Sequence, residues 1–301
     1  MVRPVIAVVG ATATGKSQLA LALASVLGHA QIVNADAMQL YQGMDIGTAK
    51  VPPGERRGIP HHQIDVLDPR QDASVAAYQH HARADLARVR EAGDWAIVVG
   101  GSGLYVRALL DDLDFPGTDP AVRAALEARL AADGADALHR DLAARDPAAA
   151  ARIDPRNVRR VVRALEVVMV TGRPFSAALP PPAHHLPTVQ FGLRLPWELL
   201  DERIARRSAG MIAEGLVEEV ANLGPLSRTA ARATGYAQAL EFLAGRAGEA
   251  ETIEAIALAT RQLARRQAKW FRRDDRTRWI DASDPDAALA AVVASLAPWL
   301  D

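Results

Sequence analysis

Cysteine is absent from this sequence of 301 residues. Its absence excludes disulfide bonds and metal sites built on thiolates, and it fits a reducing compartment such as the cytoplasm. Long apolar runs are also missing: none approaches the length of a membrane span, and the first residues lead directly into a short apolar segment. We therefore expect a soluble, cytoplasmic protein that is not exported and does not contact a membrane.

An excess of either charge is missing as well. Lys and Arg total 35 and Asp and Glu total 36, which gives a formal net charge of -1 at pH 7. The surface as a whole therefore offers no basic field, and a nucleic-acid partner would have to be bound by local clusters of arginine. Half of the residues are hydrophobic. This supply allows one large core or two modest ones, which favours a single α/β domain that carries an insertion.

A phosphate-binding loop is the most specific local motif. Residues 10–17 complete the pattern G-x-x-x-x-G-K-S directly after residues 5–9, a β-branched run typical of a buried strand. In this pattern the N–H groups point inward, the lysine adds a positive charge, the serine hydroxyl can bind Mg²⁺, and the following helix presents its positive end. We expect diphosphate binding by Gly10, Ala11, Thr12, Ala13, Thr14, Gly15, Lys16 and Ser17, with Ser17 as the metal ligand. The loop does not identify the compound, because nucleotides and other diphosphate esters satisfy the same N–H groups.

Strand-like and helix-like segments alternate along most of the chain. This alternation predicts a P-loop NTPase-like parallel sheet flanked by helices, with functional groups at the carboxyl ends of the strands. The expected strands are 5–9, 31–34, 95–99 and 189–193; the expected helices are 16–27, 74–91 (capped by Ser74), 197–213, 235–243 and 252–273, and everything after residue 193 reads as helical.

Between the third and fourth expected strands the pattern changes. Residues 119–171 carry only helical signals, rich in alanine and arginine, with breaks at Gly134, Pro147 and Pro155. This predicts an all-helical insertion domain over residues 116–188, closed by the linker Pro180-Pro181-Pro182. The core domain would then consist of residues 1–115 and 189–301.

Two polar residues fall at expected carboxyl ends of strands. Asp36 follows the second strand, where a carboxylate could accept a proton, hold a metal-bound water, or simply cap a turn. Ser102 lies among the glycines of residues 100–103, which either let the backbone approach a ligand or form a tight turn. For each residue, the chemical or ligand-binding role and the purely structural role stay open.

Arginine gathers in two stretches. The first contains Arg152, Arg156, Arg159, Arg160 and Arg163, and the second contains Arg261, Arg265, Arg266, Lys269, Arg272 and Arg273. Their spacing predicts that each set lies largely on one helical face. Either face alone is typical of a solvated surface, but two of them on a nearly neutral protein favour a phosphate backbone as the partner. The paired histidines at 61–62 and 80–81 lack acidic ligands at fixed spacing, which favours packing or turn roles over a metal.

Seven segments together resemble the tRNA dimethylallyltransferase family. They run in family order as GATATGKS (10–17), NADAMQLYQGMDIGTAK (34–50), PHHQIDV (60–66), GGSGLYVRALL (100–110), RRVVRALEV (159–167), RATGY (232–236) and ATRQLARRQAKWFRRD (259–274). The resemblance implies transfer of a dimethylallyl group from dimethylallyl diphosphate to the exocyclic amine of the adenosine 3′-adjacent to the anticodon, with help from Mg²⁺. The implied partners are the tRNA anticodon stem-loop and dimethylallyl diphosphate, and we expect a monomer.

Roles for individual residues also follow from the resemblance. Asp36 would act as the base, Lys16 would stabilise the leaving diphosphate, Ser102 would bind the target base, and Arg232 would join the diphosphate site. The implied tRNA contacts are Asp36, Ala37, Met38, Gln39, Ser102, Arg123, Arg159, Arg160, Val161, Val162, Arg163, Arg232, Ala233, Thr234, Gly235, Tyr236, Ala237, Arg265, Arg266, Gln267, Ala268, Lys269, Trp270, Phe271 and Arg272.

The sequence departs from the family pattern in two places. Ala11 replaces the usual proline of the loop, and Arg159 replaces a usual glutamine, which adds phosphate affinity at the expense of base-specific recognition. A small-molecule kinase with a helical lid, and a nucleotide-gated RNA-binding protein without transfer activity, are the alternative functions. Two measurements would separate these possibilities: whether the protein binds dimethylallyl diphosphate more tightly than ATP, and whether anticodon-loop RNA gains the mass of a five-carbon group.

Overall fold

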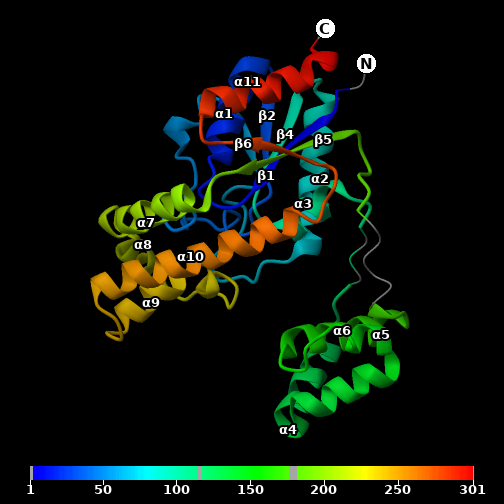
Figure 1. The fold of residues 1–301 in the computed structure, drawn as a ribbon. Helices are drawn as coiled ribbons and strands as arrows, with labels where there is room; N and C mark the ends of the chain where they lie inside the picture. The colour runs from blue at the N-terminus through cyan, green and yellow to red at the C-terminus, as the bar shows by residue number, and fades with distance from the viewer. Residues whose placement is uncertain (1–2, 114, 116, 176–181, 301) are drawn as a thin grey trace. The chain divides into compact units, whose positions relative to one another are not determined.

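A computed structural model describes residues 3–113, 115, 117–175 and 182–300; Pro116, Pro180 and Pro181, at the expected domain boundaries, lie outside these ranges. The chain divides into two compact units, Met1–Asp111 with His184–Asp301, and Asp112–Ala183 (Figure 1). The first contains β1 (Val5–Gly10), α1 (Lys16–Leu27), β2 (Ala30–Asn34), η1 (Pro53–Glu55), β3 (His61–His62), α2 (Val75–Glu91), β4 (Trp95–Gly100), α3 (Gly103–Leu110), β5 (Thr188–Arg194), α7 (Trp197–Ala213), α8 (Leu216–Leu223), η3 (Ala230–Arg232), α9 (Tyr236–Leu243), α10 (Glu249–Phe271), β6 (Thr277–Asp281), α11 (Pro285–Leu296) and η4 (Ala297–Trp299). The second contains α4 (Pro120–Arg145), α5 (Pro147–Ala150) and α6 (Val158–Thr171).

A single six-stranded sheet forms the centre of the first unit, with the strand order β3-β2-β4-β1-β5-β6. Every pairing is parallel, and β1 lies between β4 and β5 in the register Ile6 to Ile97 and Val8 to Phe191. Parallel strands end at the same edge. The loops that follow β1, β2 and β4 therefore gather at one edge, as the alternation of the sequence predicted.

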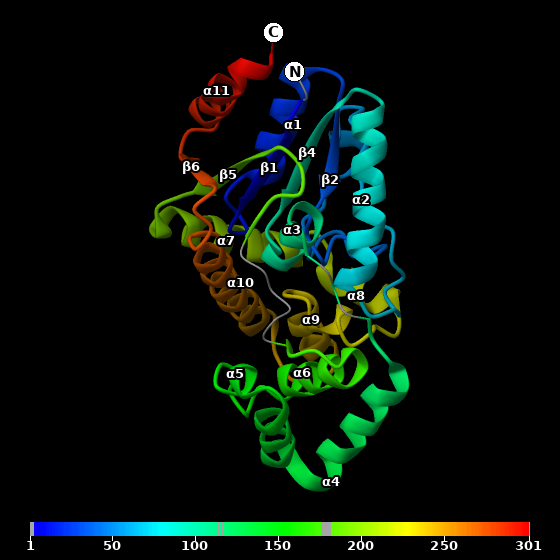
Figure 2. The ribbon, with the colours of Figure 1, turned by 90° about the vertical axis from the view of Figure 1, so that its right-hand side faces the viewer.

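The two faces of the sheet are covered by different helices. Ile6 and Val8 point to one face, where they join a cluster with Leu23 of α1 and Val292 of α11. Figure 2 shows α1 and α11 on this side and α2 on the other. There the Tyr78 hydroxyl of α2 donates to the Asn34 carbonyl oxygen at 2.8 Å. Each large apolar side chain removed from water in these layers contributes roughly 1.5–3 kcal/mol.

Most expected elements of this unit are confirmed, and some have the expected bounds. Helices α1 and α7 begin and end at the predicted residues, and Ser74 caps α2 by accepting the Ala77 N–H. The prediction that everything after residue 193 is helical is wrong, because residues 277–281 form the edge strand β6. This strand is short and partly exposed, so it lacks the continuous apolar run of a buried parallel strand. No helix in the described part of the chain has the length and apolar character needed to cross a membrane.

The second unit is helical throughout its described elements, as predicted. Leu126, Leu138 and Leu142 of α4 pack with Leu165 of α6 in one apolar cluster. Gly134 takes a φ of 78° and kinks α4, and Pro147 opens α5. Its range, Asp112–Ala183, lies close to the range 116–188 that we expected from the sequence.

Candidate functional site

The phosphate loop connects β1 to α1 in the conformation that its glycines permit. Gly10 and Gly15 have φ values of 136° and 92°, in the region that favours glycine. A Cβ atom at Gly10 would also lie 2.7 Å from the Leu193 carbonyl oxygen of β5. Both glycines of the sequence pattern are therefore required by the backbone.

Lys16 is a partly buried cation without a close carboxylate. Its Nζ donates to the Ala11 carbonyl oxygen at 2.6 Å, and no ion pair within 4 Å is found for it among the described residues. Burial lowers the pKa of Lys16 to about 8; the negative charge of Asp36 acts in the opposite direction, and Arg207 lowers the pKa further. An incoming anion would therefore be favoured at this position.

Arg207 of α7 is a second cation at the loop, and our sequence reasoning missed it. Its Nη1 donates to the Thr12 Oγ1 at 3.2 Å. Burial lowers the pKa of Arg207 while Asp36 and Glu214 oppose that shift, and its Nε is buried with no hydrogen-bond partner in the described structure. The only sequence signal is the arginine run 203–207, which does not show that α7 lies beside the loop.

Gln267 of α10 supports the loop from another side. Its Oε1 accepts the Thr12 N–H at 2.8 Å, across 255 positions of the chain. The N–H of Thr12, which we expected to bind diphosphate, is thus engaged within the protein. Gln267 itself is buried, so the structure places this expected tRNA contact against the loop.

Asp36 and Ser102 lie on turns that are joined by hydrogen bonds. The Asp36 Oδ1 accepts the Met38 N–H at 3.0 Å, so the carboxylate does cap its turn. The Ser102 Oγ accepts the Ala37 N–H at 3.1 Å and links the ends of β2 and β4. The capping alternative for Asp36 is therefore observed, and it leaves the second carboxylate oxygen for other interactions.

The glycines around Ser102 make room for the protein's own atoms. A Cβ atom at Gly100 would lie 2.2 Å from the Ala35 carbonyl oxygen, and one at Gly103 would lie 2.2 Å from the indole of Trp270. These close approaches support the tight-turn alternative, because the Gly100 approach brings the end of β4 against Ala35 and the Gly103 approach seats Trp270 of α10 against the turn after β4.

Two cavities meet at these residues. The larger, about 1100 Å³, is lined by Lys16, Ser17, Asp36, Arg203, Arg206 and Arg207 among others. The smaller, about 300 Å³, is lined by Thr12, Asp36, Ser102, Arg207, Arg232 and Arg266 among others. Asp36 belongs to both walls, whereas Lys16 and Ser17 line only the larger cavity and Arg232 only the smaller. The arrangement can hold an anion in one cavity and a second ligand in the other, with a carboxylate between them.

The expected tRNA contacts of the first unit differ in accessibility. Arg232, Arg265, Arg266, Lys269, Trp270 and Arg272 are exposed, whereas Ala233, Tyr236 and Phe271 are buried together with Gln267. The α10 cations lie largely on one side of the helix, as the spacing predicted, but they have different neighbours. Arg265 ion-pairs with Asp201 of α7 at 3.3 Å, while Arg266 lines the smaller cavity because it lies about 100° further round the helix.

The arginine stretch of the second unit is also divided. Arg152 and Arg156 lie outside α6, and Arg156 ion-pairs with Asp154 at 2.8 Å. The prediction that five arginines share one helical face is therefore wrong, because the chain turns before α6 begins at Val158. Of these five arginines, only Arg159 and Arg160 are exposed on α6. The expected contacts Val161 and Val162 are buried in the apolar cluster.

Arg123 and Arg163 have a structural partner in Glu166. The Glu166 side chain is fully buried and accepts from Arg123 Nη2 and, at 2.8 Å, from Arg163 Nη1. Burial alone would raise the pKa of Glu166, but the hydrogen bonds from the two guanidinium groups outweigh it and hold the pKa below its usual value. The Arg123 contact ties α4 to α6, whereas the Arg163 contact lies within α6.

We expect Glu166→Gln to lower the free energy of unfolding of the second unit by about 1–3 kcal/mol, because two guanidinium groups lose their buried counter-charge. The contribution is present above the ordinary carboxyl pKa and is lost as the pH falls through the lowered value. Hydrogen exchange of the α4 and α6 amides in the full chain measures the effect, with Glu127→Gln on the exposed side of α4 as the control. Equal protection in the two variants would contradict this role.

The histidine pair at 61–62 has local partners. His61 Nδ1 lies 2.7 Å from the Ile59 carbonyl oxygen, and His62 Nε2 lies 2.7 Å from Gln31 Oε1. Both residues form the short strand β3. In the described residues no cluster of three His, Cys, Asp or Glu side chains could hold a metal ion.

Comparisons with known proteins agree over nearly the whole chain. A family model described as IPP transferase matches residues 39–274. A tRNA dimethylallyltransferase of Thermobifida fusca is 56% identical over 290 residues, which cover 94% of this chain and 91% of that protein. One of Kineococcus radiotolerans is 54% identical over 294 residues, with 94% and 93% covered.

Solved structures give the same result. The full-length tRNA isopentenylpyrophosphate transferase of Bacillus halodurans is 36% identical, with a TM-score of 0.72 over 99% of this chain and 97% of that one. A eukaryotic dimethylallyltransferase acting on tRNA is 25% identical, with a TM-score of 0.82 over 97% of this chain and 77% of that one. On the evidence of the family model and of relatives more than half identical over nearly their full length, the chain belongs to the IPP transferase family.

Proposed function

We propose that this chain transfers a dimethylallyl group from dimethylallyl diphosphate to the N6 amine of the adenosine 3′-adjacent to the anticodon in tRNA. In the reaction the bond between the allylic carbon and the diphosphate oxygen breaks, a carbon–nitrogen bond forms, and the amine loses a proton. The position of Asp36 carries the proposal, since it lines both the cavity of the phosphate loop and the cavity flanked by Ser102 and Arg232.

The residues divide into two chemical roles. Lys16 and Arg207 face the larger cavity and would offset the negative charge that builds on the leaving diphosphate. An adenine amine is a poor nucleophile, because its lone pair is delocalised into the ring. Asp36 would accept the amine proton as the new bond forms, while Met38 and Asn34 hold its turn in place.

The donor set suits a magnesium ion that enters with the diphosphate. Mg²⁺ keeps several waters and takes oxygen ligands from phosphates and from one or two protein groups. Ser17 lines the larger cavity and would supply one hydroxyl oxygen. The metal would add positive charge beside the leaving diphosphate.

The exposed cations are the residues that would contact tRNA. A base stacked in an anticodon loop cannot reach Asp36, so it would be flipped into the smaller cavity at a cost of about a few kcal/mol. Arg232 and Arg266 line that cavity and are exposed, and Arg159 and Arg160 are exposed on α6 of the second unit. A monomer in the cytoplasm remains our expectation for the working form.

The reaction is tested by incubating the protein with an anticodon stem-loop RNA, dimethylallyl diphosphate and Mg²⁺. We expect a five-carbon mass gain on the adenosine next to the anticodon, and tighter binding of dimethylallyl diphosphate than of ATP. Phosphate transfer from ATP to a small molecule, or RNA binding without any mass gain, would instead support the kinase or the nucleotide-gated alternative.

We expect Arg266→Ala and Arg160→Ala each to weaken RNA binding and to flatten its salt dependence. Each neutralised phosphate contributes roughly 0.7 to 0.9 to the slope of log affinity against log salt. The Kd for dimethylallyl diphosphate should not change. Arg246→Ala is the control, because Arg246 is exposed and ion-pairs locally with Glu241. If all three variants show the wild-type slope, the exposed arginines of α6 and α10 do not bind phosphate and are only solvated helix faces.

A further inference from the structure

Residues 45–50 form a wall that the two cavities share. Asp45, Ile46 and Lys50 line the larger cavity, Gly47 lines the smaller, and Thr48 lines both. This segment, the 45–50 loop, contains neither the expected base nor a phosphate-binding group. Because the 45–50 loop lines both cavities, its position nevertheless determines part of the shape of each.

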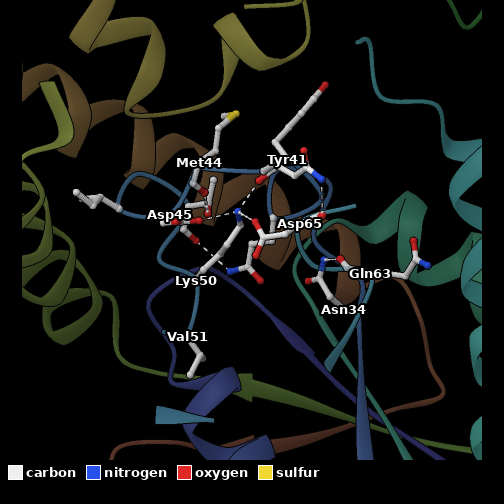
Figure 3. A network of polar contacts seen from close by, with 12 residues as sticks. Asn34, Tyr41, Met44, Asp45, Lys50, Val51, Gln63 and Asp65 are labelled. Atoms are coloured by element: carbon white, nitrogen blue, oxygen red, sulfur yellow. Dashed lines mark hydrogen bonds and ion pairs between the residues drawn. The ribbon is translucent and has the colours of Figure 1, made fainter. Parts of the chain in front are cut away.

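Lys50 fastens the loop on one side (Figure 3). Its ammonium group donates to the Tyr41 carbonyl oxygen, to Asp45 at 2.8 Å and to Asp65 at 2.5 Å, and its side chain is only 3% exposed. An ammonium group has three donors, and all three are used here. The Gln39 Nε2 adds a contact to the Thr48 carbonyl oxygen at 3.0 Å. The loop is thereby tied to the segment that follows Asp36.

Glu219 of α8 fastens the loop on its other side. Its Oε2 accepts the backbone N–H groups of Asp45 at 3.0 Å and of Ile46 at 2.8 Å. Its Oε1 accepts the hydroxyl of Tyr236. Glu219 lies 174 positions from Asp45 and 17 positions from Tyr236, so one carboxylate joins the loop to a distant part of the chain.

Tyr236 connects this carboxylate to the segment 232–237. Its side chain is fully buried, and burial together with Glu219 raises the pKa of the phenol, so that the hydroxyl remains a donor. A Cβ atom at Gly47 would lie 2.4 Å from the Tyr236 ring. The loop and the segment that carries Arg232 and Thr234, which line the smaller cavity, are therefore in direct contact.

Apolar packing alone does not explain a carboxylate at this place. Tyr41, Met44, Leu216 and Tyr236 already form one buried cluster beneath the loop. Apolar contacts are non-directional, whereas a carboxylate that accepts two consecutive N–H groups fixes the orientation of those peptide units. The hydrogen bonds from Asp45 and Ile46 to Glu219 therefore fix the position of the 45–50 loop.

We propose that Glu219 is a positioning residue, which holds the 45–50 loop in the form that admits the acceptor base to the smaller cavity. The inference rests on the proposed function. Glu219 would act through the loop and through Tyr236, without contact to either substrate. Diphosphate binding, which depends on Lys16 and Arg207, would be nearly independent of it.

The test compares Glu219→Ala with Glu219→Gln. For the alanine variant we expect the KM for an anticodon stem-loop RNA to rise by about tenfold, the effect of losing one charge-assisted hydrogen bond, with a smaller change in kcat. The Kd for dimethylallyl diphosphate should stay near the wild-type value. Glutamine retains an oxygen that can accept the two N–H groups, so Glu219→Gln should return the KM for the RNA most of the way to the wild-type value. Glu218→Ala, exposed on the same helix, is the matched control.

Hydrogen exchange of the Asp45 and Ile46 amides separates this inference from the proposed function. Faster exchange at these amides in Glu219→Ala, with no change in Glu218→Ala, supports the positioning role even if the wild-type protein transfers no prenyl group. Unchanged exchange overturns it. An equal loss of RNA and diphosphate affinity, with a lower Tm and no rescue by glutamine, also overturns it, because Glu219 would then only stabilise the fold.

Discussion

Lys16→Ala is expected to reduce prenyl transfer by about 10²- to 10³-fold, the usual effect of removing one preorganised group that stabilises a leaving anion. RNA affinity should be nearly unchanged, because Lys16 lines the larger cavity and is absent from the wall of the smaller one. Single-turnover rates and RNA binding are measured on the same preparation.

The lowered pKa of Lys16 adds a pH dependence to this prediction. Below about pH 8 the free protein carries a charged Lys16, and the charge is lost as the pH rises through about 8. The affinity for dimethylallyl diphosphate should therefore fall above that pH in the wild type, and this loss should be absent from Lys16→Ala. Lys269→Ala serves as the reciprocal control, since Lys269 is exposed on α10 and should affect RNA binding alone. Equal loss of RNA binding in Lys16→Ala would contradict our assignment of the loop.

Local patterns predicted the parts of the fold that local forces determine. The strand, loop and helix around Gly10 and Lys16 could be placed from the sequence, because the glycine spacing and the apolar periodicity act within twenty residues. The edge strand β6 could not, since only Trp279 and Ile280 of residues 277–281 are apolar and the strand pairs on one side only. The face expected for Arg152 to Arg163 was misjudged for a related reason. Periodicity gives the angle of a residue on a helix, but not where the helix begins.

The candidate site required contacts that no local pattern contains. Arg207 reaches Thr12 across 195 positions and Gln267 reaches it across 255. Glu219 reaches Asp45 across 174. These contacts are made by tertiary packing of α7, α8 and α10, and each residue type is common on a helix surface. The local patterns indicated Lys16, Asp36 and Ser102 and the resemblance to the family assigned their roles, whereas the groups that support them became visible only in three dimensions.

Ala11, one of the two departures from the family pattern, has a clear place in the structure. It is buried against Leu200 and Ile204 of α7 and Ala264 of α10. Its carbonyl oxygen accepts from both Lys16 and Thr14. Because the contact uses a carbonyl that proline also has, the hydrogen bonds of the loop do not depend on the proline that is usual there.

Asp36→Asn is the second substitution with a large expected effect, and it separates a base from a cap. Asparagine keeps the size of the side chain and an oxygen that can accept the Met38 N–H, so the turn after β2 should survive. It cannot take up the proton of the adenine amine. The rate of transfer should therefore fall by about 10²- to 10⁴-fold, the range typical of a general base.

Single-turnover kinetics with saturating dimethylallyl diphosphate measure this rate directly. The Kd for the diphosphate should change little, because Lys16 and Arg207 supply the positive charge on that side. Ser102→Ala is a useful companion: it removes the hydroxyl that accepts the Ala37 N–H, and so it disturbs the position of the turn without removing the carboxylate. If Asp36→Asn transfers the prenyl group within a few-fold of the wild-type rate, the carboxylate only holds the turn, and the proton must leave by another route.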